Sequence, residues 1–208
     1  IRAQALLEKM EQQGGLRRVM GNPLLLRLAV ALYHERGKLL QSRAELYRRY
    51  VAEVLEKREQ SRGAEDTRWK NRQIESALDA IAWTLQTEGQ KTIAELARVV
   101  EPQVEGVDNG KALVGYLRER LGLLTTHDSE QGEVVAFRHL TFREYFVARR
   151  LEQAWLADRE GAWRFLRPRL HHPDWRESVL LMAASLDETK ATELVRCILD
   201  ARSPYEQE

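Results

Sequence analysis

The spacing of hydrophobic residues along the chain predicts a mainly helical protein. Apolar side chains recur every three or four positions over residues 46–55 and 74–85, which is the period of a helix with one buried face. The stretch from Pro23 to about Glu35 is apolar on almost every side except at Arg27. A helix of this kind is expected in the middle of a bundle, not at its surface.

Local capping signals predict where several helices begin. A serine or threonine followed three residues later by glutamate can form a capping box, in which each side chain accepts from the backbone N–H of the other residue. Asn22 is a good N-cap and Pro23 a good first helical residue, because proline lacks an N–H that would be unpaired there. Three capping boxes are predicted, at Ser42–Glu45, Thr92–Glu95 and Thr141–Glu144.

The third box gives His139 a distinctive position. It predicts a helix that begins at Phe142, with Leu140 and Tyr145 as a hydrophobic staple, and His139 would lie two residues before the N-cap Thr141. An imidazole beside a helix N-terminus can help to bind an anion, because backbone N–H groups and the helix dipole favour a phosphate there. The stretch alone favours a simpler role, in which the histidine ends a strand and hydrogen-bonds locally.

The order of elements after the first bundle predicts a winged-helix domain. A polar stretch over residues 57–70 separates this second group from the first. Three helices and then two β-rich runs around a polar loop follow, and this is the order of a winged helix. The helices are expected at about 74–89, 92–100 and 109–120, and the β-rich runs at 123–127 and 134–138.

The last third of the chain is also expected to be helical. His171-His172-Pro173 interrupts the pattern, and Asp187 is the expected N-cap of a final helix that runs to Ala201. The fold class is therefore mainly α, with one β-hairpin. We predict a helical bundle over residues 1–60 (its first helices at 2–13 and 16–20), a winged-helix domain over 66–157, and the start of a second helical region over 158–208.

Charge and composition exclude several classes of function. The chain has 33 Lys and Arg against 32 Asp and Glu, so no overall field draws in nucleic acid or an anionic membrane. The one cysteine, Cys197, excludes a disulfide framework and a cysteine-based zinc site, and it suits a reducing cytoplasm. The longest apolar run, which ends at Tyr33, is too short to span a bilayer. Because the chain begins at Ile1 and lacks a signal peptide, we expect it to be part of a longer cytoplasmic protein.

Three sites suggested by short motifs are set aside on chemical grounds. Residues 106–112 superficially resemble a phosphate-binding loop, but one residue is missing between the glycines and Ala112 replaces the magnesium-binding hydroxyl. His171 and His172 would point in different directions and lack further ligands, so a loop is favoured over a metal site. Helix 109–120 would enter a DNA groove in a winged helix, but its neighbourhood is not basic, so DNA recognition is not favoured.

Two longer motifs carry a resemblance to a family. Residues 21–28, Gly-Asn-Pro-Leu-Leu-Leu-Arg-Leu, are followed by Ala-Glu-Leu-Tyr at 44–47, and residues 137–148 contain Phe-Arg-His-Leu-Thr-Phe-Arg-Glu-Tyr-Phe. The first pair is similar to the helical domain that follows the nucleotide-binding core of NACHT proteins, which belong to the STAND class of signalling NTPases. The last is similar to the Phe-x-His-x-Ser/Thr-Phe-x-Glu-Tyr/Phe motif at the end of their winged-helix domain. The resemblance covers residues 1–157, and residues 174–181 are similar to the start of the family's second helical region.

The resemblance implies a nucleotide-contacting role for Pro23 and His139. In the family, the proline of the first motif lies against the adenine ring, and the histidine of the second contacts the β-phosphate of ADP and holds a closed, inactive arrangement. Asn22, beside Pro23, belongs to the same expected site. ADP or ATP with Mg²⁺ would bind mainly to the family's phosphate loop and acidic strand. This chain lacks both, so neither tight nucleotide binding nor ATP hydrolysis is expected of it alone.

The function that the resemblance implies is a regulatory lid and switch of a NACHT signalling NTPase, a NOD-like-receptor relative. Its expected partners are the parent's own N-terminal nucleotide-binding core and, after activation, further copies of the protein, but neither a membrane nor nucleic acid. A role in innate immunity or antiviral defence is what the family suggests. Two other classes stay open: a winged-helix DNA-binding regulator, and a protein-binding helical scaffold with no nucleotide role.

Overall fold

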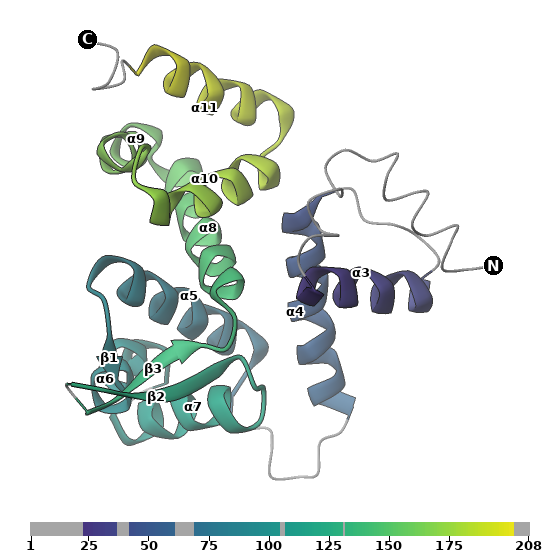
Figure 1. Cartoon of the computed structure of the whole chain (residues 1–208), viewed down its shortest axis with the longest axis vertical. Helices are drawn as coiled ribbons and strands as arrows, with labels where there is room; N and C mark the ends of the chain where they lie inside the picture. The colour runs from purple at the N-terminus through teal and green to yellow at the C-terminus, as the bar shows by residue number, and fades with distance from the viewer. Residues whose placement is uncertain (1–22, 37–41, 61–68, 105–106, 131, 202–208) are drawn as a thin grey trace.

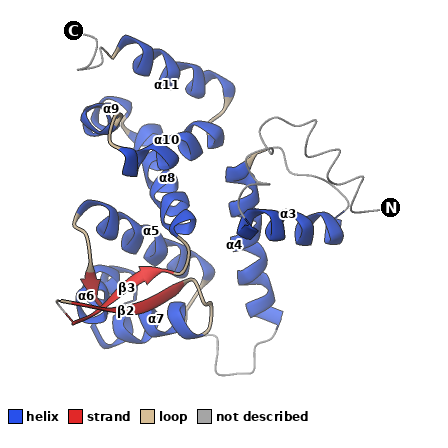
Figure 2. Ribbon diagram, in the orientation of Figure 1, coloured by secondary structure: helices blue, strands red, loops and turns tan. Residues whose placement is uncertain are grey.

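The computed structural model describes residues 23–36, 42–60, 69–104, 107–130 and 132–201 (Figure 1). These residues form a mainly helical protein with one small antiparallel sheet, which confirms the predicted fold class (Figure 2). The helices are α3 (Pro23–Arg36), α4 (Arg43–Gln60), α5 (Asn71–Thr87), α6 (Ile93–Val104), α7 (Val107–Glu119), α8 (Leu140–Ala157), α9 (Arg159–Leu166), the 3₁₀ turn η1 (Arg167–Arg169), α10 (Pro173–Ser185) and α11 (Glu188–Asp200); the strands are β1 (Lys91–Thr92), β2 (Leu124–Ser129) and β3 (Gly132–Phe137).

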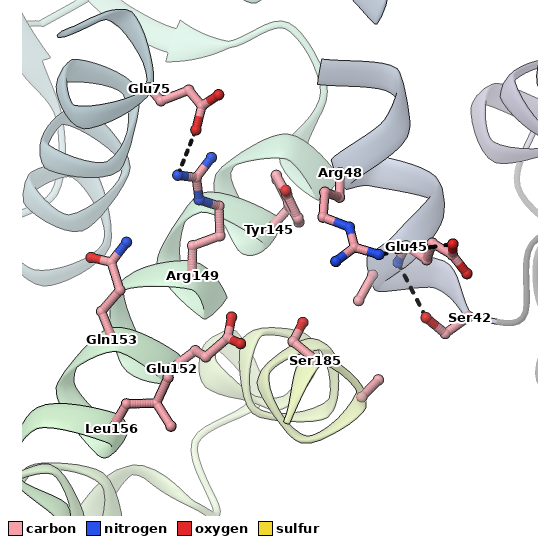
Figure 3. A pocket seen from close by; sticks show the side chains of 12 residues that line it. Ser42, Glu45, Arg48, Glu75, Tyr145, Arg149, Glu152, Gln153, Leu156 and Ser185 are labelled. Atoms are coloured by element: carbon pink, nitrogen blue, oxygen red, sulfur yellow. Dashed lines mark hydrogen bonds and ion pairs between the residues drawn. The ribbon is translucent and has the colours of Figure 1, made fainter. Parts of the chain in front are cut away.

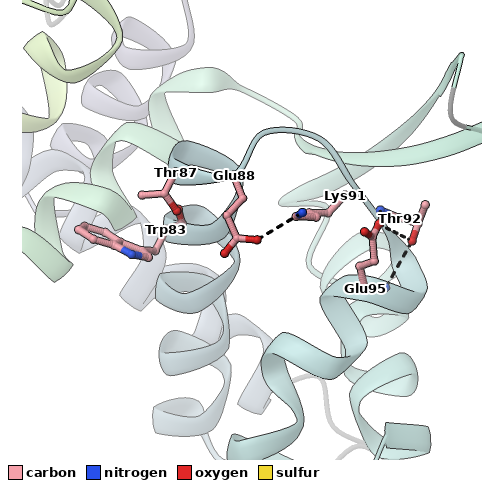
Figure 4. Close-up of polar contacts among 6 residues, drawn as sticks. All are labelled: Trp83, Thr87, Glu88, Lys91, Thr92 and Glu95. Carbon is pink, nitrogen blue, oxygen red and sulfur yellow. Dashed lines mark hydrogen bonds and ion pairs between the residues drawn. The ribbon is translucent and has the colours of Figure 1, made fainter. Parts of the chain in front are cut away.

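Two of the three predicted capping boxes begin helices as expected. Before α6, the Thr92 N–H donates to Glu95 Oε2 at 2.8 Å and the Glu95 N–H donates to Thr92 Oγ1 at 3.3 Å (Figure 4). Before α4, the Glu45 N–H donates to Ser42 Oγ at 3.1 Å. Each bond satisfies a backbone donor that the first turn of a helix leaves without a partner.

The prediction of a third capping box, at Thr141–Glu144, is wrong. Helix α8 begins at Leu140, two residues earlier than predicted. Its N-cap is His139, with φ −130° and ψ 130°, so Thr141 lies inside the first turn and does not cap the helix. The predicted staple fails too, since Leu140 is 54% exposed. Packing of Phe142 and Tyr145 against neighbouring helices fixes this end of α8, and a local capping signal does not.

The predicted hairpin is present and belongs to a three-stranded sheet. β2 pairs with β3 from Leu124↔Phe137 to Ser129↔Gly132. On the other side of β3, β1 pairs through Lys91↔Val135 and Thr92↔Val134, which gives the order β1-β3-β2. The sequence did not predict β1, because two residues are too short a run for a period-two pattern. The three strands, with α5, α6 and α7, have the arrangement of a winged helix.

Helix α8 lies at the centre of the molecule and packs against α4, α5 and α10 (Figure 1). Phe146 and Val147 are fully buried, and one hydrophobic cluster extends from Leu25 on α3 to Leu194 on α11. The outermost helix is held more loosely, since Leu194 is the one buried residue of α11 and Leu199 is 78% exposed. The chain breaks expected near His172 and Asp187 are confirmed, and each residue is the N-cap of the helix that follows.

Some predictions on chain organisation are not decided by the described residues. The expected helices at 2–13 and 16–20 lie outside them, and so does most of the polar stretch 57–70. Helix α4 continues into that stretch as far as Gln60. The predicted domain limits at 1–60, 66–157 and 158–208 therefore stay predictions.

The glycine that suggested a phosphate loop has a packing role instead. Gly110 lies on α7 and is buried against α6, where an added Cβ would overlap the carbonyl oxygen of Ala97. Gly115, one and a half turns further along α7, has no atom near the position of an added Cβ. Close contact between α6 and α7 therefore requires a glycine at position 110 and not at 115.

We expect Gly110→Ala to lower the free energy of unfolding by about 1–3 kcal/mol, because the α6 backbone must move to admit the methyl group. The matched control, Gly115→Ala, should raise it by roughly 0.5–1 kcal/mol through helix propensity. Urea denaturation followed by circular dichroism measures both. Equal effects of the two substitutions would contradict this account of the α6–α7 contact.

Candidate functional site

His139 occupies an exposed position at the N-terminus of α8. Its backbone carbonyl accepts from the Phe142 N–H at 3.0 Å, so the first turn is closed by the backbone. Its side chain makes no capping hydrogen bond, and its ring centroid lies 6.1 Å from that of Phe142. The imidazole nitrogens therefore remain available to a ligand at the positive end of an 18-residue helix.

The residues next to His139 pack against the first helical segment. Phe142 stacks on Tyr50 of α4 at 5.4 Å between ring centroids and meets the edge of Tyr47 at 5.8 Å. Tyr145 lies 5.5 Å from Tyr47, and burial raises the pKa of the Tyr47 hydroxyl to about 12. These four aromatic side chains, which we call the α4–α8 aromatic cluster, fix the winged-helix motif against α4.

An ion pair also connects α4 to α10 beside this cluster. Arg43 Nη1 lies 2.8 Å from Glu177 Oε2, with both side chains partly buried. Glu144 of α8 lies nearby, where burial and then the Glu177 carboxylate raise its pKa. The glutamate that the sequence assigned to a capping box is thus placed at a junction of three helices.

A cavity of 610 Å³ opens between α4, α5, α8 and the end of α10 (Figure 3). Arg48 reaches toward it from α4, and Glu152 and Ser185 point into it from α8 and α10. Its walls carry positively charged side chains, negatively charged side chains and several hydroxyl groups. The lining residues are Ser42, Ala44, Glu45, Arg48, Glu75, Tyr145, Arg149, Glu152, Gln153, Leu156, Ala184 and Ser185. His139 does not line this cavity.

A partly buried charge cluster lies on the α5 side of the cavity, where Glu75 and Arg149 line its wall. Arg149 Nη2 lies 2.8 Å from Glu75 Oε2, and Arg149 Nε lies 3.4 Å from Asp79 Oδ1. Burial raises the pKa of Asp79 to about 7, although the Arg149 charge opposes this shift. Sequence analysis missed the cluster, because Glu75 and Asp79 are four residues apart on a helix and have the spacing of a solvated face.

A second cavity, of 330 Å³, lies between the wing and the start of α8. Its walls include Phe137 of β3, His127 of β2, and Leu140 and Arg143 of α8. Leu140 directly follows His139, but His139 itself does not line this cavity either. The exposed histidine therefore lines neither cavity.

The described residues do not test the predicted nucleotide site as a whole. Pro23 begins α3, as predicted, but its side chain and the whole of Asn22 lie outside the described residues. Whether Asn22, Pro23 and His139 face one cleft stays a prediction. The imidazole of His139 is exposed, as contact with a ligand would require.

The sites that the sequence disfavoured gain no support from the structure. Within the described ranges, no three His, Cys, Asp or Glu side chains are arranged to hold a metal ion. His172 Nδ1 instead accepts from the Asp174 N–H at 3.3 Å. On α7, Arg118 pairs with Glu119 at 2.7 Å, so one of the cations on the expected DNA-facing helix is already neutralised.

Comparisons with known proteins add no relative. The sequence matches no protein-family model, and no curated protein matches it. Among the helices of the described ranges, none combines the length and the apolar character that crossing a membrane requires.

Burial of Asp79 should make the stability of the protein depend on pH. Folding raises the pKa of this carboxyl from 3.8 to about 7, so the folded protein binds more protons than the unfolded chain between these values. Its stability must then fall as the pH rises through that window. We expect Asp79→Asn to remove this contribution. The free energy of unfolding of the variant, minus that of wild type, should therefore rise by up to about 4 kcal/mol as the pH is raised from 4 to 8.

Urea denaturation of the two proteins at several pH values measures this difference. Glu88→Gln, which changes an exposed carboxylate just after the last turn of the same helix, serves as the control. Its free energy of unfolding should vary with pH in the same way as that of wild type. A constant offset between Asp79→Asn and wild type at all pH values would show that folding does not raise the pKa of Asp79.

Proposed function

We propose that this chain is the regulatory lid and switch of a NACHT-type STAND NTPase. The observation that carries the proposal is the position of His139, which stands exposed at a helix N-terminus and whose side chain makes no capping hydrogen bond. Phe142 and Tyr145 of the same motif are buried against Tyr47 and Tyr50 of α4. A histidine with a purely structural role would be expected to share that packing, and this one does not.

The chemistry of this position suits a phosphate group. The first backbone N–H groups of α8 and the helix dipole favour negative charge, and a protonated or neutral imidazole can add one donor to the same anion. In the proposed mechanism His139 contacts ADP held by the parent's nucleotide-binding core. Exchange for ATP changes the phosphate arrangement and removes this contact, so the two nucleotides favour different conformations.

The α4–α8 junction supplies the proposed element that responds. The aromatic cluster and the Arg43–Glu177 ion pair hold α4, α8 and α10 together. Loss of the His139 contact would favour an arrangement in which the winged helix moves and covered surfaces become free for self-association. The chain itself supplies no catalytic group in this mechanism, and hydrolysis would belong to the parent's phosphate loop and its Mg²⁺.

His139→Ala in the full-length protein tests the proposal. We expect faster release of ADP and higher basal activity, because one phosphate contact of the inactive state is lost. Stability should change by no more than about 0.5 kcal/mol, since the side chain is exposed and caps nothing. Fluorescent-ADP dissociation and thermal denaturation measure the two effects.

His127→Ala provides the matched control, because it removes another exposed imidazole, from β2, and it should leave ADP release unchanged. If His139→Ala releases ADP at the wild-type rate, the switch role of this histidine is wrong. The protein would then be better described as a helical scaffold.

A further inference from the structure

The 330 Å³ cavity between the wing and the start of α8 has an apolar floor. Leu85 of α5 and Phe137 of β3 line it and are 7% exposed, and Val135 of β3 is 2% exposed. Leu140 of α8 completes this apolar wall, but 54% of its surface is left in water. An occupant with an apolar body would remove both the floor and Leu140 from water, which is favourable.

Arg143 is the one permanently charged residue that lines this cavity. It follows Leu140 by three positions, so the two side chains lie on the same face of α8. No aspartate or glutamate is among the described residues of the wall, and His127, its other titratable residue, is exposed. The cavity therefore combines an apolar floor with a single fixed positive charge.

The guanidinium group of Arg143 has no hydrogen-bond acceptor in the described part of the chain. Its Nε atom is buried and makes no hydrogen bond, and no described carboxylate lies within 4.0 Å of the group. The neighbouring Glu144 feels the charge of Arg143 only at longer range. Because proteins rarely leave a buried N–H without an acceptor, this position is suited to an acceptor that a ligand supplies.

The cavity selects its ligand by charge and by polarity. A guanidinium group can donate two parallel hydrogen bonds to a carboxylate, whereas an amine would meet it with a like charge. An anion without an apolar body would leave the floor and Leu140 uncovered. The volume of 330 Å³ lies at the lower end of the roughly 300–1,000 Å³ that small-molecule pockets occupy, so a short hydrocarbon chain is favoured.

We propose that this cavity binds a small aliphatic carboxylate. The hydrocarbon chain lies on the floor formed by Leu85, Val135 and Phe137, and the carboxylate accepts hydrogen bonds from Arg143. The ligand contacts both the sheet and the first turn of α8, which follow one another in the chain (Figure 1). A ligand that binds only the folded protein stabilises it, so occupancy should raise the melting temperature.

This site is separate from the proposed nucleotide contact. His139 does not line the cavity, and binding of the carboxylate requires neither ADP nor the proposed switch. Titration of the full-length protein without nucleotide therefore tests the inference by itself. Its failure would leave the proposed role of His139 untouched.

A series of three small molecules tests the chemistry of the site by isothermal titration calorimetry. Octanoate has both the apolar chain and the carboxylate, octylamine keeps the chain but is a cation, and acetate keeps the carboxylate but lacks the chain. We expect octanoate to bind and to raise the melting temperature. Octylamine and acetate should each bind at least about tenfold more weakly, because each lacks one of the two contacts.

Two substitutions locate the binding in this cavity. Arg143→Met keeps an apolar side chain of similar length but removes the charge; it should weaken octanoate binding roughly 10–100-fold and abolish the preference for octanoate over octylamine. Leu140→Ser should weaken octanoate binding roughly 3–10-fold. Because Leu140 is largely exposed, this second variant should fold like wild type.

Two control variants complete the experiment. Arg72→Met removes another partly or fully exposed guanidinium, on α5 and outside the cavity, and it should bind octanoate as wild type does. His139→Ala should also retain octanoate binding. Loss of binding in His139→Ala, or competition between ADP and octanoate, would assign the cavity to the nucleotide site and overturn the proposal.

Other outcomes would also overturn the proposal. Octanoate that does not bind, binds no better than octylamine, or binds equally to Arg143→Met and wild type would each do so. Binding of a short peptide that ends in leucine, without binding of octanoate, would assign the cavity to the C-terminus of a partner protein. A dimer that Leu140→Ser dissociates would show that a second copy covers the cavity.

Discussion

The burial of α8 is the constraint on which the rest of the structure depends. Seven of its residues are buried, from Phe142 to Trp155, and they contact α4, α5 and α10 on different sides. Because one helix supplies the core for its neighbours, the winged-helix unit and the flanking helices share a single hydrophobic cluster. The same packing determines where α8 begins, and hence that His139 stands outside the core.

The proposed function depends on one property of this arrangement, the contact between α4 and α8. The aromatic cluster around Phe142 and Tyr47 is a buried contact between helices, and the proposed switch would open it.

Most of the fold could be predicted from the sequence, because helical periodicity and local capping are encoded within a few residues of each other. The Thr92–Glu95 box and the β2–β3 hairpin are examples. The start of α8 was predicted two residues too late. Thr141 has the local signal of a cap, but the tertiary packing of Phe142 determines the actual boundary, and no local pattern reports it.

The candidate site could be predicted only in part. His139 was identified from its motif, and the structure adds that its side chain is free of local bonds. The cavity walls and the Glu75–Asp79–Arg149 cluster were missed, because they join four helices whose relative positions a linear pattern does not contain. The same is true of Gly110, whose meaning depends on how closely Ala97 approaches it.

The loose attachment of α11 has a consequence for how the molecule opens. With Leu194 as its one buried residue, this helix can detach while the α8 core stays intact. Its amide hydrogens should then exchange with solvent through local unfolding, whereas those of α8 exchange only when the whole domain unfolds. Helix α11 and the α8 core are thus expected to unfold with different free energies.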